Sequence, residues 1–376
     1  MIIHRIVQAR ELMGFSKTEV ANSLEVSPSA VAQWESGVKN PSMDNLIRLA
    51  SVLRVPLGFF FKPIPDEILS TKGPLSFRAV TPTKSASVNR IKRRSQRFSE
   101  LTAEIFIWLG EMLKLPALNL PEMEIPKDAG IQKIDELAAE LRRFWNLGQG
   151  PILKLGELLE SNGIVINRMS FGDERYDAFS QVIGGRSYIF LGADKNDRAR
   201  TRFDGCHELA HLIFHQHFSE SELGEAATME IEKQAHRFAS SFLLPTDSFG
   251  REIVDTSLNG FLRLKPKWGV SVQAMLVWAK EHKIIDEEEY DDLQKHVDKR
   301  KWRRPKGESL DGHIPEVRRS IFPKALQALE ENNILKQCDI PTSLELPVSV
   351  LSQTFDVNFE EIDPVKIGNI IPFKMQ

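Results

Sequence analysis

The chain has 376 residues, of which 41% are hydrophobic and 27% are charged. This length predicts two or three domains and excludes a lone small module. The composition is typical of soluble globular proteins, no window approaches the roughly 20 apolar residues of a membrane helix, and no signal peptide follows Met1, so we expect a cytoplasmic protein without membrane contact. The net charge of −3 hides an asymmetry, because residues 1–98 carry 15 Lys and Arg against 7 Asp and Glu. That basic part fits either a nucleic-acid partner or an ordinary solvated face.

Residues 1–62 are the first predicted domain, a series of short helices. The buried face of its first helix, which stops at Gly14, is expected to be formed by Ile3, Ile6, Val7 and Leu12. Ser16 and Glu19 form a capping-box pattern at the start of a second helix. Ser27-Pro28 begins a third helix, which Gly37 ends. Two short helices with so tight a joint predict a helix-turn-helix, whose second helix can enter the major groove of DNA.

The segment FSKTEVANSLEVSPSAVAQWESGVKNPSMDNLIRLASVLRV resembles the XRE family of phage-repressor-like helix-turn-helix domains. This resemblance implies five helices, binding to double-stranded DNA as a homodimer, and a palindromic operator. The implied DNA contacts are Lys17 at a phosphate and Pro28, Ser29 and Gln33 at base edges, while Val31 and Trp34 are implied core residues. A helical hairpin used only for protein contacts or dimerisation is the alternative.

Residues 63–130 are predicted to be a linker followed by a helical connector. Pro, Gly and Ser between Lys62 and Pro82 mark the boundary, and apolar residues at helical intervals then predict a long helix to about Lys114. The start of that helix carries a run of cations, namely Arg90, Lys92, Arg93, Arg94 and Arg97. This basic start either flanks the DNA or is a solvated connector.

Five of the nine histidines lie between His207 and His236. Within a predicted helix, His207 and His211 fit H-E-x-x-H and lie on one face about 6 Å apart along the axis, so both imidazoles can bind one metal ion. Glu208 lies off that row but near enough to reach a metal-bound water. The alternative is a pair of core histidines, although apolar neighbours make unpaired imidazoles costly there. The only cysteines, Cys206 and Cys338, form no CxxC pair, so His, Asp or Glu must hold any metal.

A catalytic zinc ion usually has three protein ligands and one open position, and three residues compete to be the third ligand. His217 has the spacing of HExxHxxGxxH, but Phe214 stands where that motif has glycine. His215 continues the i+4 row one turn too far away. Glu232 belongs to a second amphipathic helix, Glu230–Leu244, which would pack on the first, and Glu230 should face elsewhere.

The segments RTRFDGCHELAHLIFH and IEKQAHRFASSFLLP resemble the ImmA/IrrE family of zinc-dependent metallopeptidases. The resemblance implies Zn2+ held by His207, His211 and Glu232, with Glu208 as the general base that activates water for attack on a peptide carbonyl. His236 departs from the Asn or Asp of the family pattern, which puts the orientation of a ligand imidazole in question.

The resemblance also covers a helix pair at 134–156, the strands 163–166 and 187–191, and the segment 177–180 between them. The second strand is expected to be an edge on which a substrate backbone pairs. Tyr188 and His215 are candidate donors to the oxyanion of the reaction.

These features predict a mainly α protein with a small β-sheet, in the α+β class. We expect a five-helix lambda-repressor-like domain, a zincin-like (gluzincin) peptidase domain at 131–250, and a mostly helical C-terminal regulatory or sensing region at 251–376. The predicted function is a DNA-binding transcriptional regulator whose zinc endopeptidase cuts a regulatory protein partner. The alternative is an autorepressor or antitoxin-like protein whose peptidase-like domain only senses or binds a partner.

Overall fold

The computed structural model describes residues 3–69, 76–77, 86–126, 129–195, 197–215, 225–302 and 307–359. The chain divides into two compact units. The first unit comprises Met1–Thr71, Thr81–Leu115 and Ile321–Gln376, and the second comprises Lys72–Val80 and Pro116–Ser320. The predicted class, mainly helical with one small sheet, is confirmed. Within the described segments, no helix combines the length and the apolar character that crossing a bilayer requires.

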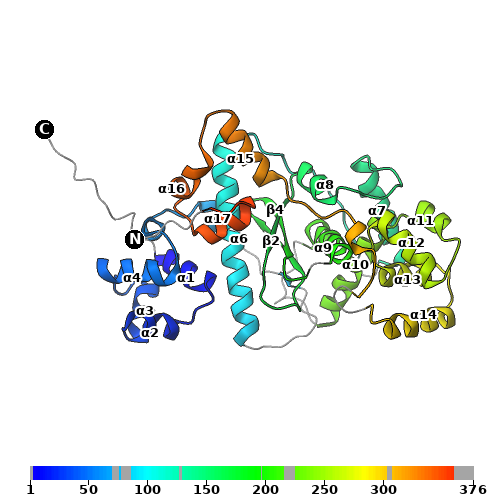
Figure 1. Ribbon diagram of the computed structural model, residues 1–376, viewed down its shortest axis with the longest axis horizontal. Helices are drawn as coiled ribbons and strands as arrows, with labels where there is room; N and C mark the ends of the chain where they lie inside the picture. The colour runs from blue at the N-terminus through cyan, green and yellow to red at the C-terminus, as the bar shows by residue number, and fades with distance from the viewer. Residues whose placement is uncertain are drawn as a thin grey trace. The chain divides into compact units, whose positions relative to one another are not determined.

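The N-terminal helices begin and end where their capping residues predict. They are α1 (Ile3–Leu12), α2 (Lys17–Leu24), α3 (Pro28–Ser36) and α4 (Met43–Leu53), followed by a 3-10 turn at Leu57–Phe60 (Figure 1). Ser16 and Glu19 form the reciprocal capping box of α2, and Ser27 caps α3. Gly37 ends α3 with a φ of 76°. Trp34 is only 5% exposed, as expected for the core of this domain.

The buried face of α1 differs from the prediction. Ile3 is 36% exposed, whereas Arg5 is fully buried. The reason is α6 (Ala86–Met112), which packs along α1 and brings a carboxylate to this face. The Arg5 guanidinium donates to both carboxylate oxygens of Glu104 at 2.9 Å. A buried ion pair thus ties the helix-turn-helix domain to the long helix, which ends at Met112, close to its predicted end.

The C-terminal helices complete the first unit. They are α15 (Ile321–Glu331), α16 (Ile340–Leu344) and α17 (Val348–Phe355). The Phe322 ring contacts the rings of Phe106 on α6 and Phe355 on α17. Lys62 donates to the backbone carbonyl of Leu344. The segment after Asp339 therefore packs with α6 and with the end of the N-terminal helical domain.

The second unit contains a four-stranded sheet of order β1-β3-β4-β2. Its strands are β1 (Ser76–Phe77), β2 (Val165–Met169), β3 (Ala178–Ile183) and β4 (Arg186–Gly192), and only the β2–β4 pair is parallel. The prediction that the strand at 187–191 is an edge is wrong, because β4 is hydrogen-bonded on both sides. Its backbone groups are already paired, so they are not available to a substrate.

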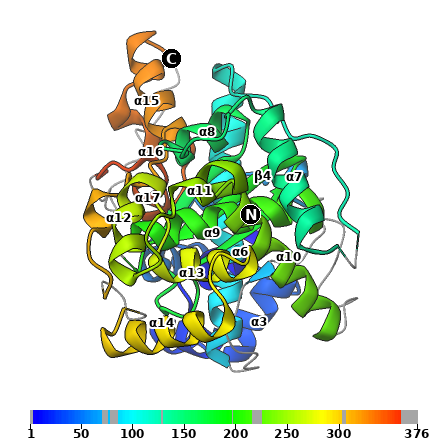
Figure 2. The same ribbon diagram turned by 90° about the vertical axis from the view of Figure 1, so that its right-hand side faces the viewer.

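Helices cover one face of this sheet. α9 (Arg198–Ala210) contacts β3 and β4, and α10 (Glu225–Leu243) lies along α9 (Figures 1 and 2). Around them lie α7 (Ile131–Phe144), α8 (Leu155–Ser161), α11 (Thr246–Glu252), α12 (Leu258–Trp268), α13 (Val272–Glu281), α14 (Glu287–Lys299) and a 3-10 turn at Asp311–His313. One core joins the sheet to the two central helices, through residues such as Ile189, Leu209 and Phe238. α9 is therefore held between the sheet and α10.

Candidate metal centre

The two histidines of the H-E-x-x-H motif lie on α9 and the turn that continues it. His207 and His211 are 1% and 7% exposed, and their Nε2 atoms are 3.0 Å apart. The helix does not continue in ideal form, since His211–His215 is a single π-helical turn. π turns of this kind often occur at functional sites. Leu209 and Ala210 anchor the helix in the core, and the histidine row thereby faces α10.

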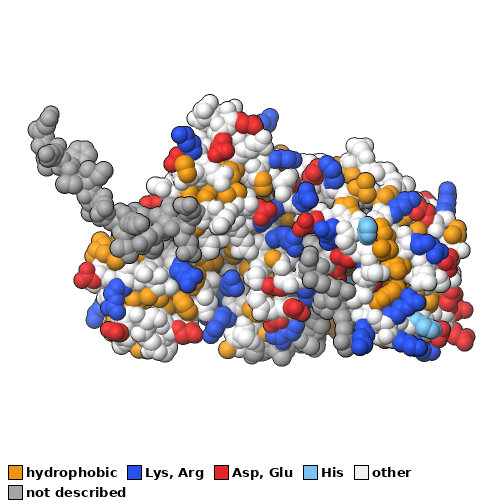
Figure 3. Space-filling view, viewed as in Figure 1, with side chains coloured by type: hydrophobic (Ala, Val, Ile, Leu, Met, Phe, Trp, Pro, Cys, Tyr) orange, Lys and Arg blue, Asp and Glu red, His pale blue; other side chains and the backbone are white. Residues whose placement is uncertain are grey.

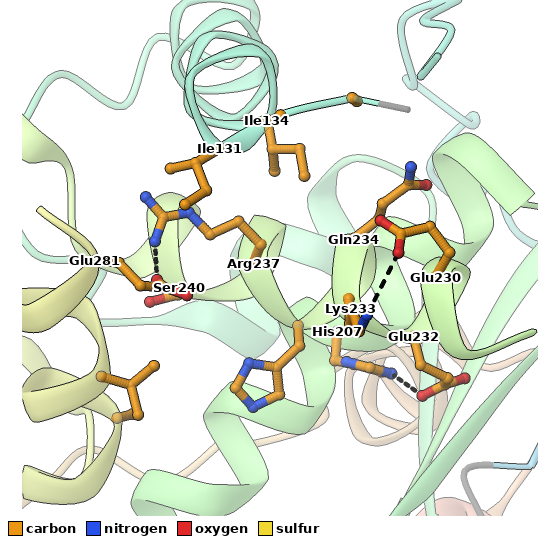
Figure 4. A pocket seen from close by; sticks show the side chains of 15 residues that line it. Ile131, Ile134, His207, Glu230, Glu232, Lys233, Gln234, Arg237, Ser240 and Glu281 are labelled. Carbon is orange, nitrogen blue, oxygen red and sulfur yellow. Dashed lines mark hydrogen bonds and ion pairs between the residues drawn. The ribbon is translucent and has the colours of Figure 1, made fainter. Parts of the chain in front are cut away.

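Glu232 on α10 meets both histidines. Its carboxylate oxygens lie 3.2 Å from His207 Nε2 and 3.4 Å from His211 Nε2. Burial alone would raise the pKa of Glu232, but the hydrogen bonds and charges of the two histidines hold that pKa well below its usual value. Glu230 points elsewhere and pairs with Lys233 at 3.6 Å (Figure 4).

This donor set fits zinc. In a tetrahedral zinc site with bonds of about 2.0–2.1 Å, neighbouring ligand atoms are about 3.3 Å apart. The three separations among His207, His211 and Glu232 span 3.0 to 3.4 Å. Two imidazoles and one carboxylate also match the ligand types of a catalytic zinc site with an open fourth position. Among the described residues this is the one group of metal-ligating side chains so close together.

The two competing third ligands are placed differently. His217 lies outside the described residues. His215 turns its Nδ1 toward His211 Nδ1 at 3.1 Å and its Nε2 toward Gln234 Oε1 at 3.2 Å. Both ring nitrogens of His215 are therefore engaged, which leaves neither to donate to a substrate oxyanion.

The contacts of His215 define a chain of hydrogen bonds with one consistent direction. Metal ligation through Nε2 leaves the Nδ1–H of His211 to donate to His215 Nδ1. The Nε2–H of His215 then donates to Gln234 Oε1, and Gln234 Nε2 donates to the Pro126 carbonyl. Burial, together with the charge of His211, lowers the pKa of His215 to about 3, so this ring is neutral as the chain requires. The sequence analysis assigned no role to Gln234. Its position two residues after Glu232 was the one sequence feature that pointed to a role near the site.

A residue of the sheet, and not one of α10, orients the side chain of Glu208. It is 2% exposed, and its Oε2 accepts a 2.7 Å hydrogen bond from Ser180 Oγ on β3. Sequence reasoning singled out 177–180 as a matching segment but did not assign Ser180 a function. Tyr188 aligns with Gln181, the residue after Ser180, so its side chain lies on the opposite face of the sheet. This placement excludes Tyr188 as an oxyanion donor.

A cleft of about 550 Å³ opens beside the three converging side chains. His207 and Glu232 line it, together with apolar residues of α7 and α13 and with His236 (Figure 4). A second hollow of about 400 Å³ shares His236, Ala274 and Val277 with the first. The ring of His236 packs on Phe203, with centroids 4.7 Å apart. The residue that departs from the family pattern thus lies where the two hollows join.

The residues expected to contact DNA lie on the surface of the first unit. Pro28 and Ser29 are exposed at the start of α3, and Gln33 is half-buried one turn further along. The Lys17 side chain is 47% exposed at the start of α2 and lies 3.3 Å from Glu35. Lys17, Pro28 and Ser29 lie at the N-terminal ends of α2 and α3, where backbone N–H groups also favour phosphate.

Two family models match this chain. The model described as a helix-turn-helix matches residues 6–60, and the model described as an IrrE N-terminal-like domain matches residues 159–279. A search of curated proteins found no match. The fused architecture that the resemblances implied is confirmed, with a helix-turn-helix segment that implies DNA binding and a domain of a metallopeptidase family.

Proposed function

We propose that this chain, which joins a helix-turn-helix domain to an IrrE-like domain, is a DNA-binding transcriptional regulator with zinc-dependent endopeptidase activity toward a protein partner. One observation supports the peptidase part above all. His207, His211 and Glu232, from two helices, converge at the spacing of a zinc site, and Glu208 is held beside them.

Each residue then has a defined task. His207, His211 and Glu232 would hold the ion, which when bound acidifies water and polarises a carbonyl oxygen. Glu208 takes a proton from the attacking water and returns it to the leaving amine. Ser180 orients the carboxylate of Glu208 for this task by donating to its Oε2.

The shape of the cleft supports a polypeptide substrate. The two hollows share His236 in their linings, and together they offer room for a chain of several residues, as an endopeptidase requires. Apolar side chains such as Ile131, Ile134 and Val277 line the larger hollow beside the charged ones. A segment of several residues with at least one apolar side chain fits this mixed lining.

On the DNA side, we propose that Lys17 contacts a phosphate and that Pro28, Ser29 and Gln33 face base edges. Gln33 is the long amide of the set and pairs bidentately with adenine. We also propose a homodimer on a palindromic operator, because two copies of one helix-turn-helix match two half-sites related by a two-fold axis.

A second candidate is a regulator whose peptidase-like domain binds a partner without cutting it. Two observations favour it. Glu208 is 2% exposed and is not among the residues that line the cleft. His236, in place of the family's Asn or Asp, packs on an aromatic ring and lies with its centroid 6.5 Å from that of His207.

Metal analysis and one substitution separate the candidates. We expect the purified full chain to hold one zinc ion, Glu232→Ala to lose it, and the neighbouring Glu230→Ala, as matched control, to keep it. Glu208→Gln should keep zinc and DNA binding but abolish cleavage of a co-expressed partner protein. A parent chain that holds zinc yet never cleaves a partner supports the second candidate, and a parent chain without zinc refutes the metal centre.

A further inference from the structure

The first turns of α6 form a basic surface that the helix-turn-helix assignment does not use. Five cations, Arg90, Lys92, Arg93, Arg94 and Arg97, occur there before the first acidic residue of the helix, Glu100. Figure 3 shows Lys and Arg side chains at the lower end of α6, the helix that packs along α1 (compare Figure 1).

These cations are neutralised to different degrees. Arg97 is 26% exposed and pairs with Glu11 at 2.8 Å and with Glu100 at 2.7 Å. Arg93 is 63% exposed and lies 3.9 Å from Glu11, the carboxylate that Arg97 already holds. Arg90 is 58% exposed, and among the described residues its one carboxylate neighbour within ion-pair distance is Glu19, at 3.9 Å. Such long, exposed pairs contribute little, so Arg90 and Arg93 are available to another anion.

Arg90 is also positioned next to the expected DNA contacts. Its side chain packs over Gly14, with Cδ 3.5 Å from the point a Cβ would occupy, and Gly14 lies in the turn that leads into α2. Its partner Glu19 is in the first turn of α2, which also carries Lys17. The guanidinium of Arg90 is therefore within about one helical turn of a residue expected to face a phosphate.

The buried contacts between α1 and α6 hold this arrangement in place. Arg5 is fully buried and binds Glu104 through two hydrogen bonds, and Gln8 donates to Glu100. Breaking such a pair would leave a buried charge without a partner, which is strongly unfavourable. The basic surface of α6 thus moves with the helix-turn-helix domain as one body.

We propose that the DNA-contacting surface extends from the helix-turn-helix domain onto α6, where Arg90 and Arg93 neutralise phosphates that flank the site read by α3. The proposal rests on the proposed DNA binding. The partner is duplex DNA, because these exposed guanidiniums lie on the helix that packs along α1, and Arg90 reaches the first turn of α2, which carries Lys17. These contacts add affinity without base recognition.

Salt dependence tests the proposal, because each neutralised phosphate contributes about 0.9 to the slope of log affinity against log salt. We expect the full chain with Arg90→Gln and Arg93→Gln to bind a fluorescein-labelled duplex of mixed sequence with a slope reduced by about 1.8. Between about 50 and 200 mM salt, the parent's advantage over this variant should shrink about 12-fold. Arg90→Lys with Arg93→Lys should keep the parental slope, because the charges remain.

Two controls make the result decisive. Lys133→Gln with Lys154→Gln removes two exposed cations of the second unit and should leave the slope unchanged. Lys17→Gln should reduce it by about 0.9. A reduced slope for Lys17→Gln with a parental slope for the α6 variant overturns the extension but keeps the proposed DNA binding. If the slope falls equally in the α6 variant and in the second-unit control, the effect reflects net charge alone. That result also overturns the extension of the DNA surface onto α6. A parent that does not bind the duplex refutes the proposed function itself.

Discussion

Replacing His215 tests whether the hydrogen-bond chain behind the proposed zinc site sets zinc affinity. His215→Phe keeps a ring of similar volume in this buried position but removes the acceptor that His211 Nδ1–H requires. A hydrogen bond of this kind contributes about 1–1.5 kcal/mol, and about 1.4 kcal/mol is a factor of ten in binding. Because loss of a partner behind a ligand histidine typically costs 10–100-fold in metal affinity, we expect a decrease at least at the lower end of that range.

The assay is a zinc titration of the full chain in competition with a chromophoric chelator. Gln234→Leu breaks the chain one link further from the ion, at the His215 Nε2–H, so its loss of affinity should be smaller. Gln234→Glu keeps an acceptor at that link and should stay close to the parent. An unchanged affinity in His215→Phe, measured beside a Glu232→Ala variant that no longer binds zinc, refutes the positioning role of the chain.

Three further predictions address catalysis, stability and pH. Ser180→Ala should lower kcat roughly tenfold and shift the acid limb of the pH profile without loss of zinc, because the Glu208 carboxylate loses its 2.7 Å donor; Ser180→Thr should restore both, and a changed KM alone would contradict this role. Trp34→Ala should destabilise the helix-turn-helix by about 3–5 kcal/mol, since this side chain is 5% exposed, and a thermal melt of the full chain checks it. In the metal-free protein, burial lowers the pKa of folded His215 to about 3, below its unfolded value of about 6.5. The unfolded chain therefore binds the proton first, and the stability of the fold should decrease as the pH drops below about 6.5. Denaturant titrations should show a weaker pH dependence of stability in His215→Phe.

The sequence predicts best what depends on a few neighbouring residues. The capping box of Ser16 with Glu19 and the Ser27-Pro28 start of α3 involve residues within one turn, and the structure has both. The spacing of His207 and His211 is likewise local, because the period of one helix determines it. Such features need no knowledge of the rest of the fold.

Features that depend on distant segments could not be read in the same way. Arg5 is buried because it pairs with Glu104, 99 residues later in the chain. Helical periodicity cannot predict such a distant partner. The interior position of β4 depends on β2 joining it in parallel, which alternation within one strand does not reveal. Ser180 reaches Glu208 across 28 residues of chain. In each case a polar group is satisfied by a residue from another element, so only the folded arrangement identifies the pair.

The location of α9 between the sheet and α10 explains how one short motif can supply both the proposed ligands and the proposed base. His207 and His211 share the side of the helix that faces Glu232 on α10, whereas Glu208, one residue on, is turned by about 100° toward Ser180 on β3. The proposed ligands thus contact one neighbouring element and the proposed base contacts another. Each can be adjusted without moving the other, so substitutions at His215 should change zinc affinity while those at Ser180 change proton transfer. If either substitution changed both quantities together, the separation of the two tasks between α10 and the sheet would be wrong.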